Sequence, residues 1–479
     1  MRNPINTMRK FYHADRIGRG YTVGFRPLTG TGMRNEVKTK YAVVAAVQLP
    51  DVSDVEFESS LAELRDLART LGFVITATFT QKRSNFDTTA YLGTGKREEI
   101  RAYVDAESFE PERILHDAID PDAGRIEVVF VDHEISPSQA RNLEIEVGCQ
   151  VMDRTMVILE IFHRHASSRA ARAQVEIARL GYMAPRLREA AKLAGPQGRQ
   201  RSGVGGRGAG ESHTELDKRK IRDRIAELQL EIEAMDADRR TQRSRRQERR
   251  GIASVALVGY TNAGKSTLMR ALTGRDGLVE NKLFATLDTT VRVLHPESVP
   301  KVLVSDTVGF IKNLPHGLVA SFKSTLEEAI DASLLLHVID ASDPGYERQR
   351  EVTDVVLTEI GAGEVPRIRV FNKIDHVGDA AAQAEREAIL RAQYPDCIVM
   401  SARRSEDVAK LYEAIIAFFH RDRIEAEILL PWSAQKMRGE IFANCEVLEE
   451  RSEEEGAFLR IRGESELVND LCRRFGPKH

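Results

Sequence analysis

A glycine-rich loop between an apolar run and a segment of helix formers is the feature that most constrains this chain. The run 252–258 predicts a buried parallel strand, and 268–272 predicts a helix. The loop fits G-x-x-x-x-G-K-[ST] and comprises Gly259, Tyr260, Thr261, Asn262, Ala263, Gly264, Lys265, Ser266 and Thr267. Backbone N–H groups of such a phosphate loop face phosphates. We expect Lys265 to reach the β- and γ-phosphates and the Ser266 hydroxyl to bind Mg²⁺.

A second motif follows the apolar run 302–304 and fits the DxxG pattern of GTPases. It comprises Asp306, Thr307, Val308 and Gly309. We expect Asp306 to hold Mg²⁺ through a water molecule and the Gly309 N–H to sense the γ-phosphate.

The base is indicated by the loop that follows the apolar run 368–371. This loop comprises Asn372, Lys373, Ile374 and Asp375. The Asp375 carboxylate can accept both N1–H and the 2-amino group of guanine, whereas adenine offers neither donor and would leave the carboxylate unpaired. We expect Asn372 and Lys373 to support the loop and cover the base. Ser401, Ala402 and Arg403 follow the run 398–400 and fit the last guanine-binding element, without its usual glycine.

The segment between the phosphate loop and DxxG must supply a threonine that closes on Mg²⁺ and the γ-phosphate. It comprises Phe284, Ala285, Thr286, Leu287, Asp288, Thr289 and Thr290. Its three threonines are candidates, and composition alone does not choose among them.

Hydrolysis needs a group that orients the attacking water, and Ras-like enzymes use a glutamine just after DxxG. Phe310 holds that position and cannot orient water. His316 is within reach in principle, although a histidine without a catalytic role is the plainer interpretation. We therefore expect slow intrinsic hydrolysis and activation from outside. The Asn262 carbonyl could coordinate K⁺ beside the phosphates, or this residue could serve only hydrogen bonds within the loop.

The patterning predicts an α/β protein in which a P-loop G domain follows an α/β N-terminal domain with a long helical hairpin. We expect a basic mobile arm (1–40), the N-terminal domain (41–155), the hairpin (156–250), the G domain (251–422) and a small α/β module (423–479). In the N-terminal domain the pattern predicts strands at 41–49, 73–79, 128–132 and 150–152 and helices at 55–71, 96–106 and 137–145. The hairpin helices are predicted at 156–188 and 214–250, and the last module has apolar segments at 428–430, 441–448 and 458–461.

Basic residues gather in the hairpin, although the net charge of −3 indicates no partner. The tip (195–211) is rich in glycine and arginine and cannot build a core, and 239–250 contains seven arginines against one glutamate. Such a run is often only a solvated face. Together with the tip it favours RNA binding through phosphates and shape, because few aromatic residues are interleaved.

Hydropathy and cysteine spacing indicate where the protein works. No apolar run approaches 18 residues, so no membrane span is expected. The four cysteines are far apart in the sequence and show no zinc spacing, which predicts reduced thiols. We expect a cytoplasmic monomer.

These motifs resemble the HflX-type GTPases, which are related to Obg and Era. The resemblance covers roughly 41–420 and rests on GYTNAGKST (259–267), FATLDTT (284–290), DTVGFIKNLPHGLV (306–319) and NKID (372–375). Outside the G domain it rests on YLGTGK (91–96), DRT (153–155) and the glycine-rich stretch 203–211.

The resemblance implies more than the residues do alone. It implies that Thr286 is the Mg²⁺ ligand of the segment 284–290, and that a hydrophobic residue replaces the catalytic glutamine, as Phe310 does. It also implies binding to the large ribosomal subunit and its rRNA, with the hairpin tip reaching toward the peptidyl-transferase region. The implied activity is GTP-dependent splitting of stalled or idle ribosomes, with hydrolysis stimulated by the large subunit.

Two alternative functions are compatible with the G domain. One is a GTP-regulated RNA-remodelling or RNA-modification factor with 41–250 as its catalytic part, although that half shows no paired carboxylates, metal cluster or cysteine nucleophile setting. The other is a nucleotide-gated binding switch with negligible turnover.

Overall fold

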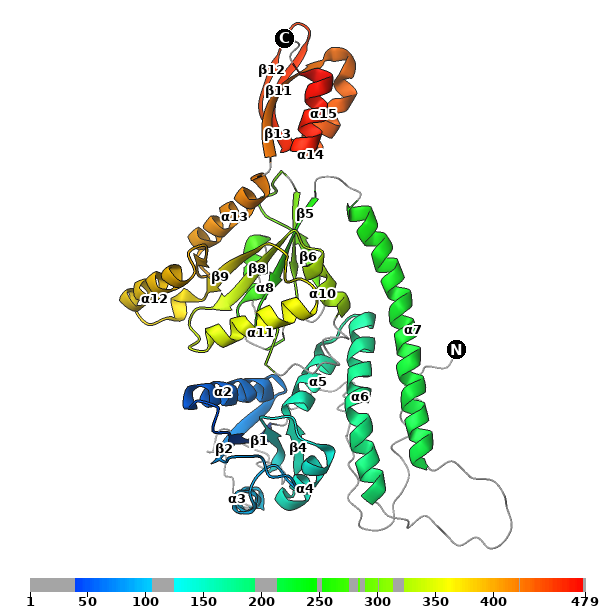
Figure 1. The fold of residues 1–479 in the computed structure, drawn as a ribbon, viewed down its shortest axis with the longest axis vertical. Helices are drawn as coiled ribbons and strands as arrows, with labels where there is room; N and C mark the ends of the chain where they lie inside the picture. The colour runs from blue at the N-terminus through cyan, green and yellow to red at the C-terminus, as the bar shows by residue number, and fades with distance from the viewer. Residues whose placement is uncertain are drawn as a thin grey trace, which may run out of the picture. The chain divides into compact units, whose positions relative to one another are not determined.

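The computed structural model contains three separate β-sheets within the residues that it describes (Figure 1). It describes residues 39–105, 125–193, 213–247, 252–274, 283–284, 289–299, 301–312, 323–421 and 423–476. The α/β class expected from the sequence is confirmed. None of the helices in these ranges is both long and apolar enough to cross a membrane.

The first sheet is parallel throughout, with the order β2-β1-β3-β4. Its inner strand β1 carries the run AVVAAV (42–47), which is buried on both faces as parallel strands covered by helices require. The elements, each within a few residues of the expected range, are β1 (Lys40–Gln48), α2 (Asp54–Thr70), β2 (Phe73–Lys82), α3 (Thr94–Asp105), β3 (Ile126–Val131), α4 (Pro137–Val147) and β4 (Gln150–Asp153).

The helix expected over 156–188 is wrong as a single element, because the structure divides it into α5 (Arg154–His165) and α6 (Arg169–Leu193). The Asp153 side chain accepts from the Met156 N–H at 2.9 Å and begins α5 early. Ala166 then turns to an extended conformation, and the Ser168 hydroxyl accepts from the Ala171 N–H to start α6. Polar caps therefore interrupt an apolar pattern that continues through them.

Helices α6 and α7 (His213–Gln247) pack side by side and antiparallel (Figure 1). Ion pairs fix this direction, since Arg169 pairs with Glu231 and Arg224 pairs with Glu176 at 3.0 Å. The tip predicted at 195–211 lies outside the described residues.

The second sheet has the order β10-β9-β8-β5-β7-β6 and is parallel except for the edge strand β6. Its strands are β5 (Ile252–Val258), β6 (Thr290–Val293), β7 (Lys301–Asp306), β8 (Leu334–Asp340), β9 (Arg367–Asn372) and β10 (Ile398–Val399). Its helices are α8 (Lys265–Leu272), α10 (Lys323–Ile330), α11 (Tyr346–Glu359), α12 (Ala380–Gln393) and α13 (Ser405–His420). The phosphate loop, DxxG, the loop 372–375 and the segment 401–403 each follow the carboxyl end of a strand here, where ligands bind in open α/β sheets.

The third sheet is antiparallel, with the order β11-β13-β12. Its elements are β11 (Arg423–Pro431), α14 (Arg438–Asn444), β12 (Glu446–Ser452), β13 (Gly456–Glu464) and α15 (Ser465–Phe475). The apolar segment 441–448 divides between a helix and a strand. One buried cluster, which includes Ile428, Leu459 and Val468, joins the sheet to its helices.

Candidate nucleotide-binding site

The phosphate loop runs from the end of β5 to the start of α8, as the motif requires. Gly259 has φ +145°, and a Cβ there would lie 2.2 Å from the Val338 carbonyl oxygen. Gly264 has φ +96°, and a Cβ there would lie 2.3 Å from the Asn372 amide nitrogen. Only glycine fits either position, so the backbone path depends on both.

Lys265 is held inside this loop before any phosphate contacts it. Its ammonium donates to the carbonyl oxygens of Gly259 and Tyr260, both at 2.8 Å. Burial lowers the pKa of Lys265 to about 8, although the Asp306 carboxylate opposes this shift. The buried Thr261 hydroxyl oxygen has no hydrogen-bond partner in the described structure, so the loop also keeps a polar atom for a ligand.

The lowered pKa of Lys265 predicts that nucleotide affinity weakens at alkaline pH. Phosphates favour the charged amine, so the bound form keeps a higher pKa and binding is strongest below pH 8. The charged fraction of the free protein falls from about 0.9 at pH 7 to about 0.25 at pH 8.5, which corresponds to roughly fourfold weaker GDP binding. Titrations of fluorescent GDP over this range measure the slope. Lys265→Arg, which stays charged, is expected to remove this slope, and a flat wild-type profile would contradict the assignment.

Two of the expected Mg²⁺ ligands lie at this end of the sheet. Ser266 stands in the first turn of α8, and Asp306, the last residue of β7, is 2% exposed and pairs in register with Leu257. Hydroxyl and carboxylate oxygens are the hard donors that Mg²⁺ prefers, so these residues fit that ion. Thr286 lies outside the described residues, together with Ala285, Leu287 and Asp288. Thr289 precedes β6, and Thr290 pairs with Asp306 across the edge of the sheet.

Phe284 is the one residue of the segment 284–288 that the structure describes. Its side chain is 3% exposed and packs edge-on against Phe162 of α5, with ring centroids 4.5 Å apart. The neighbouring Leu283 N–H donates to the Thr70 hydroxyl at 3.3 Å. The side chain of Phe284 therefore lies in the protein interior.

Asn372 joins the three loops of the predicted guanine site. Its side-chain amide donates to the Ala263 carbonyl oxygen, and its side-chain oxygen accepts from the Ala402 N–H, both at 2.9 Å. Lys373 has φ +63°, and its ammonium pairs with Asp340 at 2.8 Å. Asn372 is 2% exposed, so these bonds fix the loops to one another without access of water.

Asp375 extends from this loop beside Arg403 and His376. Burial raises its pKa, but the Ser401 hydroxyl and these two neighbours outweigh that effect and hold the pKa below its usual value. The carboxylate is therefore ionised at neutral pH and acts only as an acceptor. That is the state that reading two guanine donors requires.

Asp407 is a supporting residue that the sequence analysis missed. Its carboxylate accepts from the Ser401 N–H at 3.0 Å and so braces the loop that lacks the usual glycine. The sequence feature that could have indicated Asp407 is an acidic residue in the first turn of a helix, here α13.

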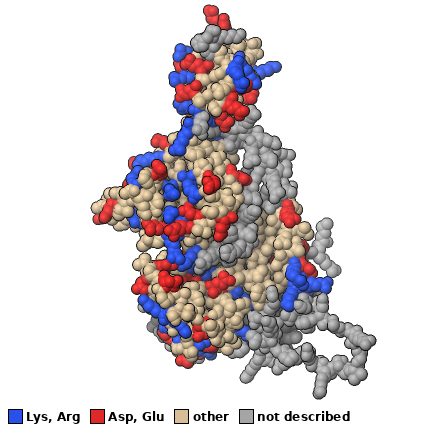
Figure 2. All heavy atoms as spheres, in the orientation of Figure 1, with Lys and Arg blue, Asp and Glu red and all other residues tan. Residues whose placement is uncertain are grey.

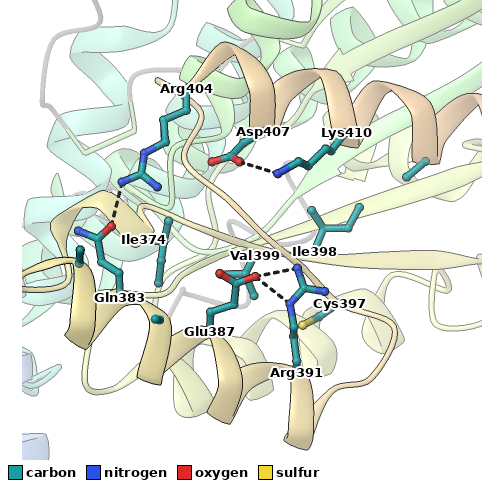
Figure 3. A pocket seen from close by; sticks show the side chains of 13 residues that line it. Ile374, Gln383, Glu387, Arg391, Cys397, Ile398, Val399, Arg404, Asp407 and Lys410 are labelled. Atoms are coloured by element: carbon teal, nitrogen blue, oxygen red, sulfur yellow. Dashed lines mark hydrogen bonds and ion pairs between the residues drawn. The ribbon is translucent and has the colours of Figure 1, made fainter.

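Asp407 also lines a pocket of about 420 Å³ between α12 and α13 (Figure 3). The charged groups in this pocket pair among themselves, Arg391 with Glu387 and Lys410 with Asp407. No phosphate-loop residue lines this pocket, so it is separate from the phosphate site.

Phe310 closes over the phosphate loop from the DxxG side. Its N–H donates to the Gly259 carbonyl oxygen at 3.1 Å, and its carbonyl oxygen accepts from the Thr261 N–H at 2.7 Å. The side chain is 1% exposed and offers no polar atom. His316 lies outside the described residues, as do the rest of the residues 313–322.

Models of three protein families match the chain. "GTP-binding GTPase N-terminal" matches residues 58–163, "GTP-binding GTPase Middle Region" matches 165–246, and "50S ribosome-binding GTPase" matches 254–373. Together these matches span most of the residues from the first sheet to the guanine loop.

Curated relatives match over nearly the full length of the chain. "GTPase HflX" of Gluconacetobacter diazotrophicus is 51% identical, over 91% of this chain and 98% of the relative. The protein of that name in Escherichia coli K12 is 34% identical, over 90% and 96%. A GTP-binding protein from Sulfolobus solfataricus, solved in complex with GDP, is 22% identical over 78% of this chain and 99% of that one, with a TM-score of 0.40.

Proposed function

Because the chain belongs to the HflX family of GTPases, we propose that it binds the large ribosomal subunit and splits stalled or idle ribosomes. The reaction is hydrolysis of GTP to GDP and phosphate. The proposal includes the domain boundaries given above, Mg²⁺ held by Ser266, Thr286 and, through water, Asp306, and K⁺ beside Asn262. We also propose that the protein acts in the cytoplasm and is a monomer.

The hairpin supports the ribosomal part of this proposal. Its two helices are held antiparallel by ion pairs, and the sequence that joins them is rich in glycine and arginine. On the face that Figure 2 shows, lysines and arginines elsewhere are interspersed with acidic residues. The sequences 195–211 and 239–250 of the hairpin concentrate arginine, and rRNA phosphates would bind such positive charge.

Hydrolysis in this site depends on positioning by the chain's own residues. Lys265 and the loop N–H groups bind the phosphates, Asp375 orients the base from a loop that Asn372 supports, and Mg²⁺ would supply charge neutralisation at the β- and γ-phosphates. Nothing at Phe310 can orient water or stabilise the developing charge. This is the observation that carries the proposal, because a site with Phe310 in the glutamine's place is expected to hydrolyse GTP slowly until an activator completes it.

GTP turnover in K⁺ buffer, with and without large ribosomal subunits, tests the proposal. We expect stimulation of roughly 10²-fold or more, since activators that complete such sites contribute about 10³ to 10⁵. Replacing K⁺ by Na⁺ tests the cation, and deleting 195–211 tests the tip in a ribosome-splitting assay. Normal GTP binding without stimulation would contradict ribosomal activation and favour the RNA-remodelling alternative.

A further inference from the structure

Tyr260 is a phosphate-loop residue whose side chain contacts the segment after DxxG. It is 7% exposed, and its hydroxyl accepts from the Lys312 N–H at 2.8 Å. Lys312 stands three residues after the DxxG glycine. One phenol therefore joins the phosphate loop to the backbone of the segment that must respond to the γ-phosphate.

The same phenol lies against a buried ion pair of the first α/β domain. Glu63 of α2 pairs with Arg154, and its carboxylate faces the Tyr260 hydroxyl. Burial and this carboxylate raise the pKa of Tyr260 well above its usual value, so the phenol stays protonated. A second glutamate of α2, Glu56, pairs with the Lys312 ammonium at 3.0 Å. Two acidic residues of one helix thus lie beside the two partners of the Tyr260 hydrogen bond, Glu56 as an ion-pair partner of Lys312 and Glu63 as a charge near the phenol.

Backbone hydrogen bonds complete this attachment next to the phenol. Phe310 exchanges a pair of bonds with Gly259 and Thr261, which makes a short parallel bridge centred on Tyr260. We name the bridge and the Tyr260–Lys312 hydrogen bond together the Tyr260 latch.

The Tyr260 latch holds Gly309 where a γ-phosphate needs room. That phosphate must lie between Lys265 and the Gly309 N–H, because both groups bind it. Here a methyl group at Gly309 would lie 2.9 Å from the Thr261 side chain and 3.1 Å from the Lys265 ammonium. Gly309 therefore packs directly against Thr261 and beside the Lys265 ammonium. A γ-phosphate bound to both Lys265 and the Gly309 N–H would separate these groups, and the adjoining Tyr260 latch would loosen. GDP has no γ-phosphate, so its binding does not require Gly309 to move.

We propose that Tyr260 is a positioning residue that biases the site toward GDP, by holding the segment after DxxG on the phosphate loop. Glu63 and Arg154 keep the phenol in place for this role. GTP affinity then includes the work of opening the Tyr260 latch, and GDP affinity does not. The inference concerns nucleotide preference of the GTPase alone and does not depend on ribosome binding.

Tyr260→Phe in the full chain tests this inference, because it removes one hydroxyl and keeps the ring. We expect the ratio of affinities for the β,γ-imido analogue of GTP over GDP to rise by about two- to tenfold, the range of one net hydrogen bond. Calorimetric titration with each nucleotide and Mg²⁺ gives the ratio. Tyr412→Phe is the matched control, since its hydroxyl donates to the Pro296 carbonyl oxygen elsewhere in the same domain and should leave the ratio unchanged.

A second variant tests the contribution of the first α/β domain. Glu63→Gln should shift the ratio in the same direction, and the double variant with Tyr260→Phe should shift it by less than the sum, because both changes act on one contact. An unchanged or lowered ratio in Tyr260→Phe, or equal loss of both affinities, would overturn the proposal. Full additivity would overturn the role of Glu63.

Discussion

Asp375→Asn is expected to weaken GTP binding by about 10²- to 10⁴-fold. Two hydrogen bonds from guanine to an ionised carboxylate are lost, each worth about 1.5–3 kcal/mol. The amide also turns a donor toward the guanine N–H groups. The low pKa of Asp375 means that this loss applies across neutral pH, since the wild-type group is ionised throughout.

The measurement is titration with GDP and with xanthosine diphosphate, which replaces the 2-amino group of guanine by a carbonyl oxygen. The variant should bind the xanthine nucleotide better than GDP, because its amide can donate to that oxygen. Asp379→Asn is a matched control four residues away. Asp379 caps α12 by accepting from the Ala382 N–H, and asparagine caps equally well. Retained GDP affinity in Asp375→Asn would exclude this residue from base recognition.

The sequence predicted all four strands of the first sheet and β5, β7, β9 and β10 of the second, because continuous apolar runs bounded by polar turns have few other solutions. The strands β6 and β8 were not singled out from the sequence. Prediction failed where capping decided the outcome. The apolar spacing of α5 and α6 continues across the break at 166–168, where Ala166 is extended and the Ser168 side chain caps a new helix. The division of the apolar segment 441–448 between α14 and β12 was also not predicted. Its burial depends on an antiparallel sheet whose strand order no local sequence pattern reveals.

At the nucleotide site, the motifs predicted which residues gather at one edge of the sheet, and their contacts with nucleotide stay predictions. Residues that act between loops were not predictable in this way. Asn372 reaches Ala263, 109 positions earlier in the chain, and Lys312 donates to Tyr260 across 52. Such bonds follow from strand order, so they become visible only when the sheet is assembled.

Arg154 shows the same limit in the first α/β domain, where DRT (153–155) was singled out without a role. The structure gives it one, because the Arg154 side chain is 2% exposed and pairs with Asp132 at 2.7 Å and with Glu63. Ser60 also donates to Asp132 at 2.7 Å. Burial alone would lower the pKa of Arg154, but the two carboxylates raise it above the ordinary value, so the charge is kept.

Arg154→Met is therefore expected to destabilise the first α/β domain by about 3–5 kcal/mol. It preserves volume but leaves two carboxylates without their counter-charge, and one of them, Asp132, is itself buried. Hydrogen exchange of the amides in β1 and β3 reports this loss locally and separates it from unfolding of the other sheets. Arg69→Met is the matched control, because Arg69 pairs with Asp66 at the surface and should contribute no more than about 1 kcal/mol. Adding Glu63→Gln should recover part of the stability of Arg154→Met, since a neutral amide needs no counter-charge. Equal protection in the Arg154 and Arg69 variants would show that the buried pair does not stabilise this domain.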